Sequence, residues 1–201
     1  MPKRSAADTS PQADVRERIL ETASSLFYEL GARAVGVDLV VARAGVAKTS
    51  LYRYFRTKDD LVAAFLQRED EDFWAKWDSV AAQHPGAPLR ELEAHCDWIG
   101  ERLARPGYRG CPQLNIAAEF PDETHPARQV AITHKAELRA RLESLIAEMG
   151  IRPASRVAGQ VALLINGAFV SAQILQPDEA SDLLKQAVMA ILNAQAPAPP
   201  V

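Results

Sequence analysis

The residues best suited to chemistry lie in one short helix-forming stretch, residues 47–55. Its apolar positions are Leu51 and Tyr54, preceded by Val46, and we expect them to face a core. The spacing then leaves a polar and basic outer face, which consists of Lys48, Thr49, Ser50, Tyr52 and Arg53. Such a face can donate hydrogen bonds to base edges and phosphates in a DNA major groove. The alternative is a small three-helix packing unit with a solvated polar face, and spacing alone leaves both interpretations open.

Catalytic and metal-binding chemistry has little support in the rest of the sequence. His95, Cys96 and Asp97 are adjacent, and neighbouring helical residues point in different directions, so they do not form a catalytic triad. No Gly-rich phosphate loop, nucleophile elbow or dinucleotide fingerprint is found. The four His and two Cys lack the closely spaced pairs of a zinc module. We therefore predict that the protein is not an enzyme and has neither a metal nor a cofactor.

Composition and charge indicate a globular chain whose two parts differ in charge. Of 201 residues, 48% are hydrophobic and 24% are charged, which is enough apolar content to bury a core. Residues 1–58 carry 10 basic and 6 acidic residues, whereas the other 143 carry 13 basic and 20 acidic ones. The excess of positive charge in the first quarter and of negative charge in the remainder suggests that the two parts have different roles. Without a signal peptide or a membrane-length apolar run, we expect a cytoplasmic protein with no membrane partner.

Helical periodicity punctuated by Gly and Pro predicts an all-α fold of about nine helices. A capping box at Asp14 is expected to open the first helix, and Gly31 to end it. Residues 37–55 have helix-turn-helix spacing, with Gly45 at the turn. A second capping signal at residues 57–60 opens a long helix that extends to about Gln83. The later helices are predicted over residues 89–104, 112–120, 126–149, 154–175 and 178–194.

The segment AGVAKTSLYRYF at residues 44–55, followed by TKDDL at 57–61, closely resembles the DNA-binding segment of the TetR/AcrR family of one-component transcription regulators. The preceding helix, with ILETA at 19–23 and Leu26-Phe27 ahead of Gly31, is also similar to the family. The detailed resemblance covers residues 15–66. It implies a helix-turn-helix DNA-binding domain at 14–58 and a ligand-binding and dimerisation domain at 59–194. A disordered arm at 1–13 and a disordered tail at 195–201 would flank them.

This resemblance also implies which residues contact double-stranded DNA. Carried over position by position, the contacts fall on Lys48, Thr49, Ser50, Tyr52, Arg53 and Tyr54, and Lys58 would hold a phosphate. Two positions depart from the family pattern. Gly36 stands where a capping Ser or Thr is usual, and Val41 replaces the usual Ala at the helix crossing.

The helices after residue 58 are implied to form a homodimer that binds a small-molecule effector. On the helix predicted over 154–175, one face carries Leu164, Gly167, Ala168, Ser171 and Leu175. We expect this face at the subunit interface, with a stripe on the last helix made of Ala180, Leu184, Ala187, Val188 and Ile191. The opposite face, with Ala162, Asn166, Phe169 and Gln173, is expected to face the interior. Packing of both faces within one monomer is the alternative.

An effector pocket is expected near RGCP at residues 109–112, which resembles a pattern in one subgroup of the family. The candidate ligand-binding residues are Trp98, Cys111, Leu114, Asn115, Phe120, His134, Asn166 and Phe169. Ordinary core packing is the alternative for each of them. A mostly apolar cavity would favour an uncharged or weakly polar organic ligand.

These observations predict a regulator, in the family's commoner mode a repressor, that binds a palindromic operator as a homodimer and is released by its effector. Activation is an alternative mode. A thiol- or redox-sensing repressor is a second alternative, because Cys111 lies near a predicted helix N-terminus beside Arg109, an environment that favours a reactive thiolate.

Overall fold

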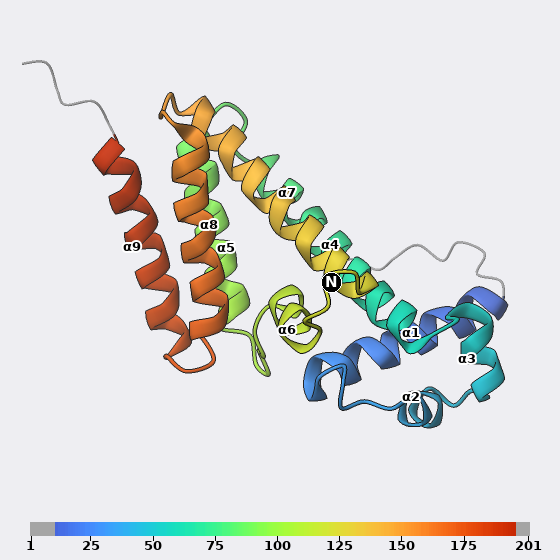
Figure 1. Cartoon of the computed structure of the whole chain (residues 1–201). Helices are drawn as coiled ribbons and strands as arrows, with labels where there is room; N and C mark the ends of the chain where they lie inside the picture. Colours follow the sequence, from blue (N-terminus) through green and yellow to red (C-terminus); the bar gives the residue numbers. More distant parts are fainter. Residues whose placement is uncertain (1–10, 196–201) are drawn as a thin grey trace, which may run out of the picture. The chain divides into compact units, whose positions relative to one another are not determined.

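The computed structural model describes residues 11–195, and all of its regular elements over that range are α-helices (Figure 1). The helices are α1 (Pro11–Leu30), α2 (Val37–Ala44), α3 (Lys48–Tyr54), α4 (Lys58–Ala81), α5 (Pro88–Leu103), α6 (Pro112–Glu119), α7 (Pro126–Glu148), α8 (Ala154–Ser171) and α9 (Pro177–Gln195). The all-α prediction is confirmed.

The described residues form two compact units. The first unit contains residues 11–69 together with Asn115–Ala131, and the second contains Asp70–Leu114 and residues 132–195. Each division falls inside a helix, so α4, α6 and α7 contribute residues to both units. The predicted arm and tail mostly lie outside the described residues, although α1 begins at Pro11 and α9 ends at Gln195.

Two predicted helix ends are wrong. Helix α1 begins at Pro11, so Asp14 lies in its first turn and is not the N-cap. Proline is favoured at the first helical position, and an acid in the first turn suits the helix dipole. Helix α8 ends at Ser171, four residues before the predicted end. The N–H groups of Ile174 and Leu175 both donate to the Ser171 carbonyl at 2.8 Å, in a turn that reverses the chain before Pro177.

The first unit is built around α1, which packs against α2 and α3. Buried side chains from all three helices form its core, among them Ile19 and Phe27 from α1, Val40 from α2 and Leu51 from α3. The ring of Phe27 meets Phe65 of α4 edge-on at 6.0 Å between centroids. Helix α1 therefore supplies the platform on which α2 and α3 rest.

In the second unit, α9 packs against both α5 and α8. Helices α5 and α9 approach each other closely at Gly100, where an added Cβ would lie 2.9 Å from the Cβ of Ser181 and still closer to its Oγ. A second contact joins α4, α5 and α7, because the Phe73 ring lies 5.0 Å from Trp98 and 4.8 Å from His134. No helix within residues 11–195 has the length and apolar character needed to cross a membrane.

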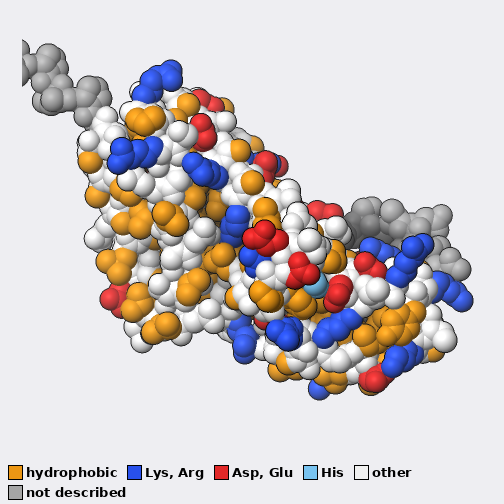
Figure 2. All heavy atoms as spheres, in the orientation of Figure 1, with side chains coloured by type: hydrophobic (Ala, Val, Ile, Leu, Met, Phe, Trp, Pro, Cys, Tyr) orange, Lys and Arg blue, Asp and Glu red, His pale blue; other side chains and the backbone are white. Residues whose placement is uncertain are grey.

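The faces predicted for the subunit interface are exposed only in part. In and after α8, Gly167 and Leu175 are exposed, Leu164 and Ser171 are half-buried, and Ala168 is buried. On α9, the predicted interface residues Ala180, Leu184 and Val188 are buried inside the unit. For these three residues the alternative, packing within one monomer, is the one that the structure supports. The large exposed apolar side chains of α8, its C-terminal turn and α9 are Leu163, Val170, Ile174, Leu175 and Leu183. Hydrophobic side chains are visible across the surface of these two helices (Figure 2).

Candidate nucleic-acid interface

The turn between α2 and α3 depends on a glycine in the left-handed conformation. Gly45 has φ 64° and ψ 41°, and the Val46 N–H donates to the Val41 carbonyl at 3.1 Å, which closes the end of α2. Residues other than glycine rarely adopt this conformation at a helix end. Helix α3 follows directly, and its Leu51 side chain is fully buried. The turn and this one anchor fix which side of α3 faces outward.

The outward side of α3 carries most of the predicted DNA contacts. Lys48, Thr49, Tyr52 and Arg53 are exposed, while Ser50 and Tyr54 are half-buried. Lys and Arg side chains are visible over the face of the first unit that carries α1–α3 (Figure 2). Gly36 occupies the N-cap of α2 without a side-chain capping bond, in keeping with its departure from the family pattern.

Lys48 has a partner that the sequence pattern did not reveal. Its Nζ lies 2.7 Å from Oδ1 of Asp38 in the first turn of α2. The hydrogen bond and charge of Asp38 raise the pKa of Lys48 above its usual value. Both side chains are largely exposed, and exposed ion pairs are weak, so a phosphate can compete with Asp38 for this amine.

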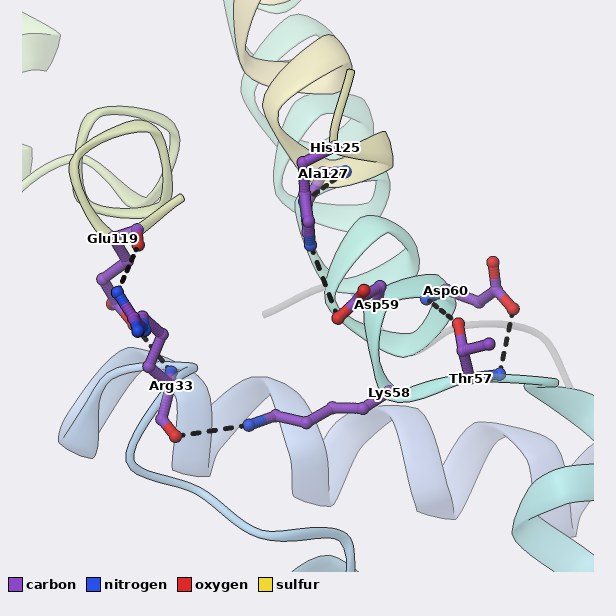
Figure 3. A network of polar contacts seen from close by, with 8 residues as sticks. All are labelled: Arg33, Thr57, Lys58, Asp59, Asp60, Glu119, His125 and Ala127. Carbon is purple, nitrogen blue, oxygen red and sulfur yellow. Dashed lines mark hydrogen bonds and ion pairs between the residues drawn. The ribbon is translucent and has the colours of Figure 1, made fainter. Parts of the chain in front are cut away.

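Lys58 opens α4 behind a reciprocal capping box. The Asp60 N–H donates to Thr57 Oγ1 and the Thr57 N–H donates to Asp60 Oδ2, each at 3.0 Å (Figure 3). The half-buried Lys58 side chain directs its Nζ to the carbonyl oxygen of Arg33 at 3.3 Å. Burial lowers the pKa of Lys58. An ammonium group has three donors, so this contact leaves others for a phosphate.

The predicted ligand-binding residues are divided between the two units. Asn115 and Phe120 belong to the first unit, where the Phe120 ring stacks on His125 at 4.1 Å between centroids. The other six belong to the second unit: Trp98, Cys111, Leu114, His134, Asn166 and Phe169. Only these six lie in the same unit, so only they are considered together as a candidate ligand site.

Two of the six, Trp98 and His134, belong to a network of aromatic and charged side chains. Trp98 and His134 both contact Phe73, and the Nδ1 of His134 lies 2.7 Å from Oδ1 of Asp70. Burial lowers the pKa of His134, although the bond with Asp70 opposes this effect. The Trp98 Nε1 and the Asn166 Oδ1 are both buried with no hydrogen-bond partner in the structure.

Cys111 and Phe169 both lie near the amine of Lys135. Lys135 Nζ lies 3.6 Å from Sγ of Cys111 and 5.4 Å from the centre of the Phe169 ring. The Tyr108 hydroxyl donates to the Phe169 carbonyl at 3.0 Å. Both Cys111 and Phe169 are buried, and Leu114 packs half-buried against the same core.

Sequence reasoning missed the charged partners of these residues, namely Asp38, Asp70 and Lys135. None of them lies on the same helix as the residue it contacts, so helical periodicity carries no signal for it. Across the described part of the chain, no group of three or more His, Cys, Asp and Glu side chains is placed to hold a metal ion.

Comparison with known proteins agrees with this arrangement. A family model, "Bacterial regulatory proteins, tetR family", matches residues 19–65. The transcriptional repressor KstR2 of Rhodococcus jostii is 34% identical over 75% of this chain and 72% of its own length. The chain spans less than two thirds of the first curated relatives, for example 60% of the transcriptional regulator AcuR of Cereibacter sphaeroides, at 30% identity over 63% of this chain.

A solved structure of a TetR-family transcriptional regulator from Streptomyces coelicolor is also similar. It superimposes with a TM-score of 0.88 at 30% identity, over 92% of this chain and 98% of that one. The helix-turn-helix, the all-helical remainder and these relatives agree, and the chain belongs to the TetR family of DNA-binding transcriptional regulators.

Proposed function

We propose that this protein is a repressor that binds a palindromic operator as a homodimer and releases it when a small organic ligand binds in the second unit. The observation that carries the proposal is the outer face of α3, where Lys48, Thr49, Tyr52 and Arg53 are exposed behind a left-handed glycine turn. A relative at 34% identity is named a repressor, which favours repression over activation.

An exposed apolar face on α8 supports the homodimer. Leu163 is 73% exposed, Val170 51% and Ile174 85%. Leu163, the exposed Gly167 and Val170 are separated by four and three residues, a spacing that forms one seam on a helix, and Ile174 lies in the turn that directly follows α8. A contiguous apolar seam marks an interaction surface, and a second copy would cover it symmetrically. Two-fold symmetry then explains a palindromic operator.

Two buried polar atoms support a ligand in the second unit. The indole N–H of Trp98 is a donor and the Asn166 Oδ1 is an acceptor, and neither has a partner in the structure. A buried polar group left without a hydrogen bond costs about 1–3 kcal/mol. An uncharged organic molecule that offers an acceptor to Trp98 or a donor to Asn166 would satisfy such an atom, and we assign Trp98, Asn166 and Phe169 as the first candidate contacts.

Operator recognition is tested by selecting duplexes from a random-sequence pool with the purified protein. We expect an inverted repeat to emerge and to bind much more tightly than a duplex that holds a single half-site. Lys48→Ala should weaken binding to every sequence, whereas changes at Thr49 or Arg53 should alter the preferred bases. If selection enriched no sequence, operator recognition by this protein would be disproved.

A thiol-sensing repressor is the second candidate, because an ammonium group lies 3.6 Å from Cys111 Sγ. Redox-sensing cysteines lie in positively charged surroundings of this kind. Cys96 provides the matched control, since burial raises the pKa of its thiol to about 12. If the candidate is right, a mild oxidant will release operator from the Cys96→Ser variant but not from Cys111→Ser. Equal release from both variants would eliminate it.

A further inference from the structure

Arg33, in the connection between α1 and α2, is held from two other helices of the first unit (Figure 3). Its backbone N–H donates to Oε2 of Glu119 at 2.7 Å, and its Nη1 donates to the Glu119 carbonyl at 3.3 Å. Its own carbonyl accepts from Lys58 Nζ at 3.3 Å. The last residue of α6 and the first residue of α4 therefore meet at one backbone position.

Gly31 leaves the space that this contact needs. It adopts φ 88°, and a Cβ added there would lie 3.2 Å from Oε1 and 3.5 Å from Oε2 of Glu119. Its N–H closes α1 by donating to the Phe27 carbonyl at 3.0 Å. The glycine that ends α1 thus also admits the Glu119 carboxylate to the backbone of the next turn.

The position of Glu119 is unfavourable for α6 itself. A carboxylate at a helix C-terminus is opposed by the helix dipole. The end of α6 is instead stabilised by Arg128, whose Nη1 donates to the carbonyls of Ala117 and Phe120. Because α6 gains nothing from an acid at this position, the contact with Arg33 is the interaction that accounts for it.

We propose that Glu119 is a positioning residue for operator recognition, which it serves by holding the backbone of Arg33. Arg33 lies four residues before α2 begins, and Lys58 lies four residues after α3 ends. Both ends of the helix-turn-helix are therefore fastened at Arg33, and Glu119 fixes that point through the N–H. The proposal rests on sequence-specific DNA binding and is independent of the homodimer and of the effector.

The first test compares Glu119→Ala with Glu123→Gln, which removes one negative charge from the same segment without touching Arg33. Affinity is measured for the selected duplex and for a random duplex, at several salt concentrations. We expect Glu119→Ala to weaken the selected duplex about tenfold, the effect of one lost charge-assisted hydrogen bond. Random-duplex affinity should not fall and the salt slope should stay constant, because no phosphate contact is lost.

Two further variants separate positioning from simple loss of charge. Glu119→Gln keeps an acceptor for the Arg33 N–H and should hold operator affinity within about threefold of the native protein. Glu119→Asp keeps the charge but is one methylene shorter, so it should lose affinity like Glu119→Ala. If Glu119→Ala does not fold, Glu119→Asp takes its place in the comparison with Glu123→Gln. An equal operator loss in Glu119→Ala and Glu123→Gln, or full affinity in Glu119→Asp, would overturn the proposal.

Amide hydrogen exchange at Arg33 provides a readout that needs no DNA. We expect this amide to exchange about tenfold or more faster in Glu119→Ala and Glu119→Asp, and to remain protected in Glu119→Gln. An unchanged Arg33 exchange rate in the first two variants would show that Glu119 does not hold it. A failure of the native protein to select any duplex would instead count against operator recognition, and the exchange result would still decide whether Glu119 holds Arg33.

Discussion

At the scale of single residues, Lys48 of the candidate DNA interface already has an acidic partner, Asp38, which competes with DNA phosphate. Asp38 Oδ1 lies 2.7 Å from Lys48 Nζ, so a phosphate that binds this amine competes with a carboxylate. We predict that Asp38→Asn strengthens binding to all duplexes by about three- to tenfold at low salt, because it removes that competition and one negative charge. Fluorescence anisotropy with operator and random duplexes measures the gain.

The matched control is the double variant Asp38→Asn/Lys48→Ala. If the competition acts through Lys48, most of the gain should be absent when Asp38→Asn is introduced into a Lys48→Ala background. Stability should change little, since exposed ion pairs contribute about 0–1 kcal/mol. A gain of the same size with and without Lys48 would mean that Asp38 acts only through its general charge.

The same residues show how far sequence reasoning reaches at a site. The exposure of Lys48, Thr49, Tyr52 and Arg53 could be predicted, because burial of Leu51 fixes the orientation of a short helix. The partner of Lys48 could not, since it depends on the angle between α2 and α3 at Gly45. The residues that hold Arg33 were also missed, because Glu119 is 86 positions away in the chain.

At the scale of elements, the crossing of α5 and α9 depends on Gly100. We predict that Gly100→Ala lowers the free energy of unfolding by about 1–3 kcal/mol, because its Cβ would overlap Ser181 and force the helices apart. This loss should outweigh the gain in helix propensity of about 1 kcal/mol. Urea denaturation at a fixed protein concentration measures the difference.

Gly159 of α8 is the matched control, because an added Cβ there meets its nearest atom, Arg139 Nη2, only at 3.9 Å. Gly159→Ala should be neutral or stabilising by up to about 1 kcal/mol. Adding Ser181→Gly to Gly100→Ala removes both overlapping atoms and should recover part of the loss. A Gly100→Ala variant as stable as Gly159→Ala would refute a close crossing at this position.

The ends of the helices were predicted better than the faces that they bury. Capping, glycine and proline signals located all the described helices within a few residues, since these signals are local. The outward face of α8 was predicted only in part: Gly167 is exposed as expected, but Leu164 is half-buried and Leu163 is the exposed leucine. These two leucines lie about 100° apart on a helix. Which of them is buried depends on where α9 and α5 pack, and the sequence pattern of α8 does not contain that information.

At the scale of the whole molecule, buried histidines make the fold sensitive to acid. Burial lowers the pKa of His95, which stacks on Trp77 at 3.6 Å, from 6.5 to about 4. Between these two values the unfolded chain binds a proton that the folded chain does not. The free energy of unfolding should therefore fall as the pH decreases from about 6.5 to about 4, by roughly 3 kcal/mol from this residue.

The variant His95→Phe keeps a ring against Trp77 and removes the titrating group. Its stability above pH 6.5 should be close to that of the native protein, and its loss in acid should be smaller. Urea titrations at several pH values give the two curves, and their difference isolates His95 from the carboxylates. Parallel curves across this window would show that His95 does not titrate as the burial implies.

Assembly is the largest scale at which the chain can be tested. The seam on α8 and the turn after it leave Leu163, Val170 and Ile174 exposed in one copy, and their burial in a homodimer would contribute about 25 cal/mol per Å² of apolar surface. A glutamate in this seam would place two symmetry-related charges in an apolar interface, which is strongly unfavourable.

We therefore predict that Leu163→Glu converts a species of about twice 22.0 kDa into a monomer, as measured by sedimentation. Because each copy would then read one half-site alone, affinity for the inverted repeat should fall to that for a single half-site, while half-site affinity stays unchanged. Leu89→Glu is the control, since Leu89 is 46% exposed on α5, a different helix from the one that carries the seam, and its charge should leave assembly intact. If Leu163→Glu remained dimeric, the subunit interface would have to lie on another face of the second unit. The homodimer would then no longer explain the exposure of Ile174.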